Sequence, residues 1–338
     1  MTEGRAAARA PGRAEPPAIV WSWPDAARGL VYALPAIAVT SVNPAAGVPL
    51  ALGVLPSAIM PFPGTARSRP LLLIVGALTG VSLFTGAALT HLPTLVTAVT
   101  LVAVVAAAAW ATTRVAAAQL LLVLAAPLVA VGLSYDDWAS ALRLLLLMVL
   151  GAVYAWAVSM LWKPRPPQPR PQRPVPSAPA MLGYGFCLGT AAAVSYLVAI
   201  GLDLDHPGWA PAACLLVARP DPDLLRARGA GRVLSVIVGA AAAVLTLAAD
   251  AANGLLAVLT GVVISAAAAT HASRWYITSA FTTYLVFLLL LGDHPNQAGQ
   301  KFTERVAETV LGVTLAVLSE PARRPWFRIS RASAEAAH

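Results

Sequence analysis

Four side chains near the end of the chain have the types and spacing needed for anion or proton chemistry. Glu304 and Glu308 are four residues apart, which places both carboxylates on one face of a helix. Arg305 and Thr309 have the same spacing on a different face. All four open an apolar segment, where charged side chains are costly and usually face a partner, a cavity or a pathway. Either Glu308 takes part in proton-linked work, or it forms an ion pair with Arg305 that anchors the helix end.

A second arginine opens an apolar segment about 160 residues earlier. Arg143 has no acidic partner one turn ahead, since Leu146 and Leu147 occupy those positions. Its guanidinium must therefore pair across helices, extend to the lipid headgroups or meet an anion. Together with Arg305 it would form a positive ring suited to bidentate contacts with a carboxylate.

Other polar or small side chains within apolar segments are candidates for a substrate pathway or for helix packing. Arg69 and Arg232 each stand at the cytoplasmic start of a predicted span, where they would draw anions from the cytosol. Trp209 is expected either in the interfacial aromatic belt or stacked on an aromatic substrate. The hydroxyl groups that would line a pathway or bridge helices belong to Thr282 and Thr283, and the small residues expected to allow close helix packing are Gly76, Gly80, Gly239 and Gly312.

The elements that position these residues must lie in a membrane. The chain has 338 residues, 58% of them hydrophobic and only 11% charged, and its mean hydropathy is +0.73. A soluble domain carries about 25% charged residues. This composition excludes a cytosolic enzyme, a disordered chain and a nucleic-acid-binding domain, although the net charge is +8.

Two apolar blocks flank one break, a segment that alternates proline with arginine and glutamine. A span needs about 20 apolar residues, so each block holds six short spans. We predict an all-α polytopic membrane protein with about twelve transmembrane helices, ten being the alternative, arranged as two parallel six-helix repeats. The predicted organisation is an N-terminal tail over 1–27, a first repeat over 28–162, a linker over 163–180, a second repeat over 181–319 and a C-terminal tail over 320–338.

The basic residues orient this arrangement. Of the 23 basic residues, only Arg143, Lys301 and Arg305 fall on the outer side when the N-terminus is placed inside. Cytoplasmic loops carry the excess of lysine and arginine in membrane proteins. The pattern predicts a bacterial inner-membrane protein with both termini and the linker in the cytoplasm.

The two blocks also resemble each other. Arg69 to Gly76 matches Arg232 to Gly239 in spacing, and Met148-Val-Leu-Gly151 matches Thr309-Val-Leu-Gly312. The offset is about 160 residues in each case. An even number of spans per block makes this a parallel repeat, related by an axis along the membrane normal.

The second block resembles a known family over residues 181–319. The motifs that carry the resemblance are His206-Pro-Gly-Trp209, Arg219-Pro-Asp-Pro, Arg232 followed by Gly239, Ser279-Ala-Phe-Thr-Thr283 and Arg305-Val-Ala-Glu308-Thr309-Val-Leu-Gly312. These are similar to the fusaric acid resistance (FUSC) family of aromatic acid exporters. The first block carries the resemblance weakly, and the family's Arg-x-x-Gly-Thr reads Arg232-Val-Leu-Ser235. The resemblance implies two six-span repeats and export of aromatic carboxylates.

We therefore expect an exporter of small organic anions such as aromatic carboxylic acids, driven by the membrane potential or a proton gradient. The alternatives are a passive anion channel, a non-transporting scaffold for envelope assembly, or a lipid-modifying enzyme that uses Asp221 and Asp223. There is no Walker A loop, HExxH or GxSxG motif, so no catalytic residue, cofactor or metal is expected. The expected partners are the organic anion, the bilayer, and either a second copy or a periplasmic adaptor, with no nucleic acid.

Overall fold

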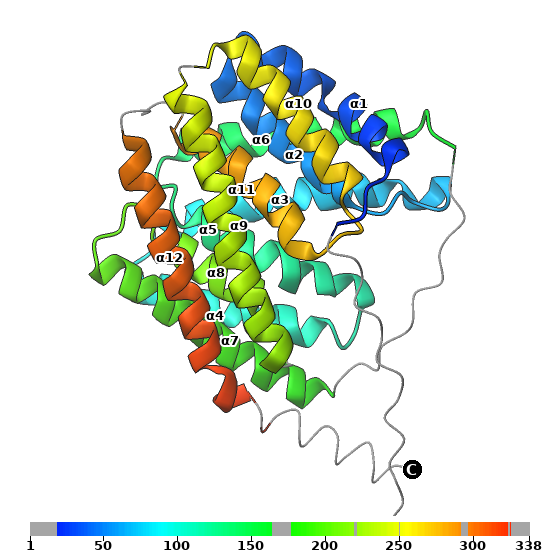
Figure 1. The fold of residues 1–338 in the computed structure, drawn as a ribbon. Coiled ribbons are helices and arrows are strands. Elements are labelled where there is room, and N and C mark those ends of the chain that lie inside the picture. The colour runs from blue at the N-terminus through cyan, green and yellow to red at the C-terminus, as the bar shows by residue number, and fades with distance from the viewer. Residues whose placement is uncertain are drawn as a thin grey trace, which may run out of the picture.

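The computed structural model describes residues 19–163, 177–219, 222–249, 251–291, 297–323 and 325, and its elements over these residues are all helical (Figure 1). Most of the predicted linker and tails, over 1–18, 164–176, 324 and 326–338, lies outside the described residues. The described part is therefore the helical body that positions the candidate residues.

Each predicted apolar segment contains a helix. The helices of the first block are α1 Trp23–Thr40, α2 Pro44–Ile59, α3 Pro70–Leu89, α4 Thr94–Ala111, α5 Ala126–Gly132 and α6 Trp138–Ser159. Those of the second block are α7 Ala178–Gly201, α8 Trp209–Val217, α9 Pro222–Ala248, α10 Asn253–Ala269, α11 Trp275–Leu291 and α12 Ala298–Leu318.

The helices differ greatly in length. Five are long and apolar enough to cross a membrane, namely those over 66–89, 94–111, 138–159, 178–201 and 224–248. Four apolar helical stretches are shorter, and α8 has only 9 residues. The chain is thus an all-helical, multi-pass membrane protein, and the count of twelve spans stays a prediction.

Several helix starts differ from the sequence prediction, and α7, for example, begins at Ala178 inside the predicted linker. α1 begins at Trp23, so the residues from 23 to 27 belong to the helical body and not to the predicted tail. α9 begins at Pro222, whereas a span from 231 was expected. The leucine, arginine and alanine residues from 224 to 228 are good helix formers, so the helix extends through this charged segment.

The two blocks interlock through helices distant in sequence. α1 lies beside α10, and α4 lies beside α7 (Figure 1). Each of the two buried apolar clusters draws on both blocks: one combines residues such as Leu101 and Leu188, the other residues such as Tyr32 and Phe287. The blocks therefore do not form two separate bundles.

The helix contacts have a regular order. Each helix of the first block corresponds to the helix six places later, so that α1 corresponds to α7, α4 to α10 and α6 to α12. Under this correspondence the pair α1–α10 matches α7–α4, the pair α2–α6 matches α8–α12, and the pair α3–α5 matches α9–α11. All six of these pairs are in contact. The order of contacts in one block is therefore repeated in the other.

Glycines bring two of these pairs into close contact. A Cβ on Gly312 of α12 would lie 2.1 Å from the carbonyl oxygen of Ala210 in α8, and one on Gly151 of α6 would lie 2.5 Å from that of Leu50 in α2. Among the other candidates, Gly76 packs on Ala152, Gly239 on the Ala280 carbonyl and Gly80 more loosely on Leu145. Small residues allow such backbone approach between membrane helices.

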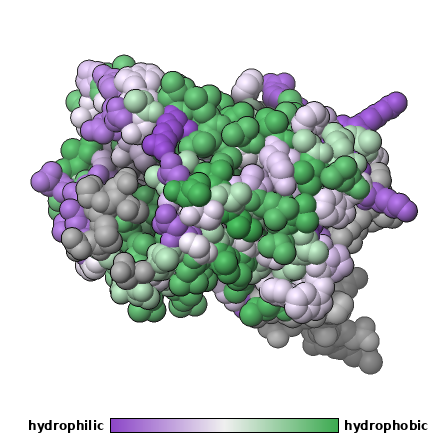
Figure 2. Space-filling model, turned by 90° about the horizontal axis from the view of Figure 1, so that it is seen from above, coloured by the Kyte–Doolittle hydropathy of each residue, from purple (hydrophilic) through white to green (hydrophobic). Residues whose placement is uncertain are grey.

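The outer surface of the helical body is rich in apolar side chains. Figure 2 shows hydrophobic residues across the middle of one face and hydrophilic residues toward its ends. Large side chains such as Leu245 and Val99 are more than half exposed, at 69% and 68%. Such extensive exposure is unusual for a soluble monomer and fits contact with lipid.

Replacing Gly312 by alanine tests the α12–α8 contact. The new methyl group would meet backbone at 2.1 Å, and overpacking of this kind costs about 1–3 kcal/mol. The thermal unfolding temperature in detergent should fall. Gly299→Ala is the matched control on the same helix, because nothing lies within 4 Å of its Cβ position. An equal unfolding temperature for the two variants would show that the contact is absent.

Candidate functional site

The buried Arg305 side chain is the centre of the candidate site. Only 3% of its surface is exposed. Its Cζ atom lies 3.7 Å from the centre of the Trp209 ring of α8, and its Nη1 lies 3.5 Å from Oε2 of Glu308, one turn further along α12. We call these three residues the Arg305 site. The two sequence interpretations, an Arg305–Glu308 ion pair and proton-linked work by Glu308, thus apply to the same buried site.

The Arg305 site holds polar atoms without hydrogen-bond partners. Among the described residues, Arg305 Nε and Nη1, Glu308 Oε1 and Trp209 Nε1 are buried and make no hydrogen bond. Buried polar groups in proteins are nearly always hydrogen-bonded, because an unmade bond costs about 1–3 kcal/mol. Free guanidinium N–H groups in a buried position are suited to an anionic acceptor, above all a carboxylate.

A rim of charged residues covers the outer end of the Arg305 site. Glu304 accepts a hydrogen bond from the Asp205 backbone N–H, and Lys301 forms an ion pair with the Asp205 carboxylate. Burial lowers the pKa of His206 to about 4, so this imidazole is neutral at physiological pH. The Lys301 hydrogen bond lowers the pKa of Asp205.

Three rim residues have the chemistry of metal ligands. Ligand atoms of Asp205, His206 and Glu304 lie within 4.8 Å of one another. This group could not be recognised in the sequence, because the loop before α8 and the start of α12 are far apart in the chain. Lys301 and a backbone N–H already engage the two carboxylates. Both carboxylates of the rim are therefore already engaged within the protein.

Two cavities of very different size adjoin the site. The cavity lined by His206, Glu304, Arg305 and Glu308 has a volume of only about 10 Å³, which is about the room that one water needs. A separate cavity of about 560 Å³ is lined by Arg143 and Tyr135. Leu290 lines both cavities. The sequence predicted that Arg143 and Arg305 would form one positive ring. In the structure the two arginines line separate, neighbouring cavities instead.

Arg232 lies deeper than predicted. Because α9 begins at Pro222, Arg232 stands in the third turn of the helix and not at its cytoplasmic end. Its side chain is 6% exposed, donates a hydrogen bond to Ser279 of α11, and lies within electrostatic range of Arg305. Two of the predicted arginines are thus buried within electrostatic range of each other.

Arg69 and the predicted threonines serve local contacts. Arg69 is buried, donates to the Trp162 carbonyl and lies over the Phe62 ring. The Thr282, Thr283 and Thr309 hydroxyls each donate to a carbonyl one turn back in their own helix, at Thr278, Ser279 and Arg305. Arg69 and these three threonines are not among the described residues that line the small cavity at the Arg305 site. Asp221 and the side chain of Asp223 lie outside the described residues.

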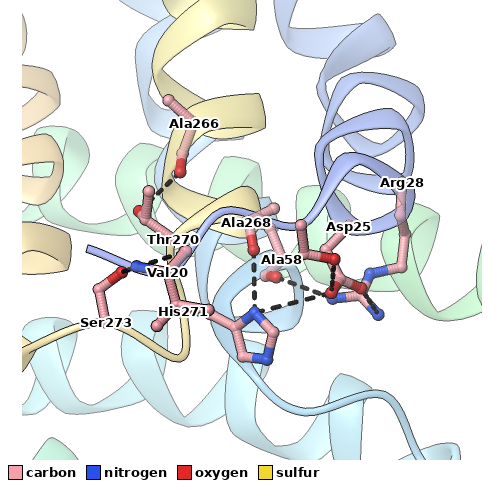
Figure 3. Close-up of polar contacts among 10 residues, drawn as sticks. Val20, Asp25, Arg28, Ala58, Ala266, Ala268, Thr270, His271 and Ser273 are labelled. Atoms are coloured by element: carbon pink, nitrogen blue, oxygen red, sulfur yellow. Dashed lines mark hydrogen bonds and ion pairs between the residues drawn. The ribbon is translucent and has the colours of Figure 1, made fainter. Parts of the chain in front are cut away.

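A second buried charge pair joins α1, α2 and the end of α10. Arg28 forms an ion pair with Asp25 at 3.1 Å and donates to the Ala58 carbonyl, while His271 lies 3.9 Å from the same carboxylate (Figure 3). The Ser273 hydroxyl bonds the Val20 backbone nearby. Sequence analysis placed Asp25 in a tail and so missed this cluster, which ties the two blocks together.

Comparison with known proteins supports the resemblance seen in the sequence. Residues 190–319 match the family described as fusaric acid resistance protein-like. The matched segment contains Trp209, Arg232 and the whole Arg305 site. The resemblance is thereby confirmed for most of the second block, and it indicates a membrane transporter of the efflux type. Neither the curated proteins nor the solved structures include a match to this chain.

The depressed pKa of His206 gives a prediction for stability. An unfolded histidine takes up a proton below pH about 6.5, whereas the folded protein resists protonation down to about 4. This residue's contribution to stability is therefore lost as the pH falls from about 6.5. The His206→Gln variant has no such loss. As the pH is lowered from 7 to 5, the difference between its unfolding temperature and that of the unmodified protein should therefore shift in favour of the variant. A difference that is independent of pH would contradict the burial of His206.

Proposed function

We propose that this protein exports small organic anions, such as aromatic carboxylic acids, and that the guanidinium of Arg305 receives the anion inside the membrane. The observation that supports this most directly is the buried guanidinium with N–H groups that lack acceptors. The Trp209 ring on which it lies offers an apolar face beside the charge. The family match over residues 190–319 supports an efflux-type transporter independently of the geometry.

The approach of Arg232 to Arg305 gives the proposed path its direction. Arg232 is on the helix that begins at the predicted cytoplasmic side, and Arg305 is on the helix that begins at the opposite side. An anion would exchange one guanidinium for the next as it moves outward. Movement of an anion toward a positive exterior is favourable by about 2.3 kcal/mol per charge per 100 mV. The membrane potential is therefore sufficient to drive export, and a proton gradient is the alternative driving force.

We infer further that the two blocks arose by duplication and act as parallel repeats of six helices. The support comes from the matching order of helix contacts and from the paired glycine contacts, Gly312 on Ala210 and Gly151 on Leu50. The offsets in these pairs repeat the spacing of about 160 residues seen in the sequence motifs. Some of the twelve elements, above all α8, are too short to span a bilayer alone.

Two other functions remain as competing proposals. A passive anion channel would use the same arginines but would show no coupling to a gradient. A scaffold for envelope assembly would move no anion and would need no acceptor for the Arg305 N–H groups. The Arg305 N–H groups that make no hydrogen bond therefore favour transport over a scaffold. We propose no enzymatic activity, and partners beyond the anion and lipid would be a second copy or a periplasmic adaptor.

Efflux of radiolabelled benzoate from reconstituted vesicles tests the proposal. A potential that is positive outside should accelerate efflux, and Arg305→Ala should reduce the rate about tenfold or more, because a hydrogen bond to a charged group contributes about 1.5–3 kcal/mol. Arg305→Lys keeps the charge but loses the planar fork, and should be intermediate.

The matched control for this assay is Arg114→Ala. Arg114 also lies over a tryptophan ring, that of Trp110, but is exposed near the end of α4. Its removal should leave efflux unchanged. Absence of efflux from vesicles with the unmodified protein would refute transport, and equal rates in both alanine variants would refute the role of Arg305.

The proposed orientation in a bacterial inner membrane gives a separate prediction. The distribution of basic residues places both termini in the cytoplasm. A fluorescent protein fused to the C-terminus should therefore fluoresce, and alkaline phosphatase fused there should be inactive. The opposite pair of results would invert the proposed direction of transport.

A further inference from the structure

The cavity around Arg143 combines a single positive charge with an apolar wall. Its volume is about 560 Å³, within the range of about 300–1,000 Å³ that is usual for small-molecule sites. Among the described lining residues, Arg143 is the only charged side chain, and it is exposed. Leu144 and the consecutive Leu288, Leu289 and Leu290 provide much of the apolar wall.

Backbone amides add to the positive character of this cavity. Its lining includes Asn253 from the start of α10, while the start of α2 contributes less, because Pro44 has no N–H and the Asn43 side chain accepts from the Ala46 amide. The first amides of a helix carry partial positive charge. Among the described residues no side chain caps α10, and the Leu255 and Leu256 amides donate to the Ala252 carbonyl, which leaves the amides of Asn253 and Gly254 for a ligand. Ser140, from the start of α6, is less favourable because Asp137 already caps that helix.

The relation between the two blocks explains why this cavity is open. If Gly151 on Leu50 corresponds to Gly312 on Ala210, then Pro49 takes the place of Trp209 and Leu147 that of Glu308. In this register Arg143 takes the place of Glu304 and Leu144 that of Arg305, so the first block has neither the ring nor the carboxylate that close the space around Arg305. The Arg305 cavity of about 10 Å³ holds no organic anion in this conformation, whereas the Arg143 cavity has room for one.

We propose that the Arg143 cavity is an outward-facing vestibule that binds a monoanion with an apolar body, and that Leu290 separates it from the Arg305 site. Leu290 lines both cavities, and Tyr135 of the vestibule lies within electrostatic range of Arg305. This inference rests on the proposed transport of organic anions, for which it supplies the place of release. The comparisons assign nothing here, because Arg143 lies outside the matched residues.

The composition of the wall sets the selectivity of the vestibule. Tyr135 is the one aromatic side chain among the described lining residues, and the rest of the apolar surface is aliphatic. An aliphatic wall buries apolar area without regard to the π-system of the ligand. The vestibule should therefore bind benzoate and cyclohexanecarboxylate about equally well, and should not bind the uncharged benzamide.

Protection of an introduced cysteine tests this site without measuring transport. Ser140→Cys places a thiol on the vestibule wall, in a background in which Cys187 and Cys214 are replaced, and a neutral impermeant maleimide is added from outside. At about ten times its Kd, benzoate should slow labelling about tenfold, since the free fraction falls as one over one plus the ratio of anion to Kd. Cyclohexanecarboxylate should do the same, and Arg143→Ala should abolish both effects.

The controls make each outcome decisive. Asp136→Cys is exposed in the same region but does not line the cavity, so its labelling should not respond to anions. Asn253→Cys is a second reporter on the opposite wall in case Ser140→Cys fails to fold. Lack of protection at both reporters, protection that survives Arg143→Ala, or protection by benzoate alone would each overturn the inference. Protection without vesicle efflux would preserve the binding site and refute transport instead.

Discussion

Burial of the Arg305 charge is the constraint on which the site depends. A guanidinium inside a membrane protein needs compensation, since the surrounding medium offers little. Trp209 supplies a ring face at 3.7 Å, worth about 2 kcal/mol or more in a desolvated setting, and Glu308 supplies an opposite charge at 3.5 Å. Neither partner satisfies the Arg305 Nε and Nη1 donors. In our proposal, these partners hold the charge in the interior, and the unsatisfied donors receive the anion.

The backbone arrangement that makes this burial feasible is the close contact between α12 and α8. Gly312 lies one turn beyond Glu308 and has no Cβ to keep the two helices apart. Trp209 is the first residue of the short α8, so the chain delivers its ring directly from a loop into the core. The first block has the same glycine contact without the tryptophan or the glutamate, and there the space beside Arg143 forms a cavity. In our proposal, one repeated architecture thus provides both a closed and an open position for an anion.

Much of the helical organisation could be predicted from the sequence, because long apolar runs leave few alternatives. The starts of α1 and α9 could not, since both lie in polar segments where apolar content gives no signal. For the same reason Arg232 was placed at a helix end and is found in the third turn. Local spacing correctly related Glu308 to Arg305, since helical neighbours are fixed by periodicity. Trp209 and the Asp205 loop come to the same site through tertiary packing of segments about 100 residues apart, which one sequence does not reveal.

The central claim, that the Arg305 guanidinium receives the anion, is tested most directly by solid-state NMR in bilayers. Benzoate labelled with ¹³C at its carboxylate would be added to protein labelled with ¹⁵N in its arginine guanidinium groups. The account predicts a dipolar coupling between the carboxylate carbon and guanidinium nitrogens that loses one component in Arg305→Lys, and that component persists in Arg143→Lys. A coupling that is unchanged by Arg305→Lys, or no coupling at all under conditions of benzoate efflux, would contradict it.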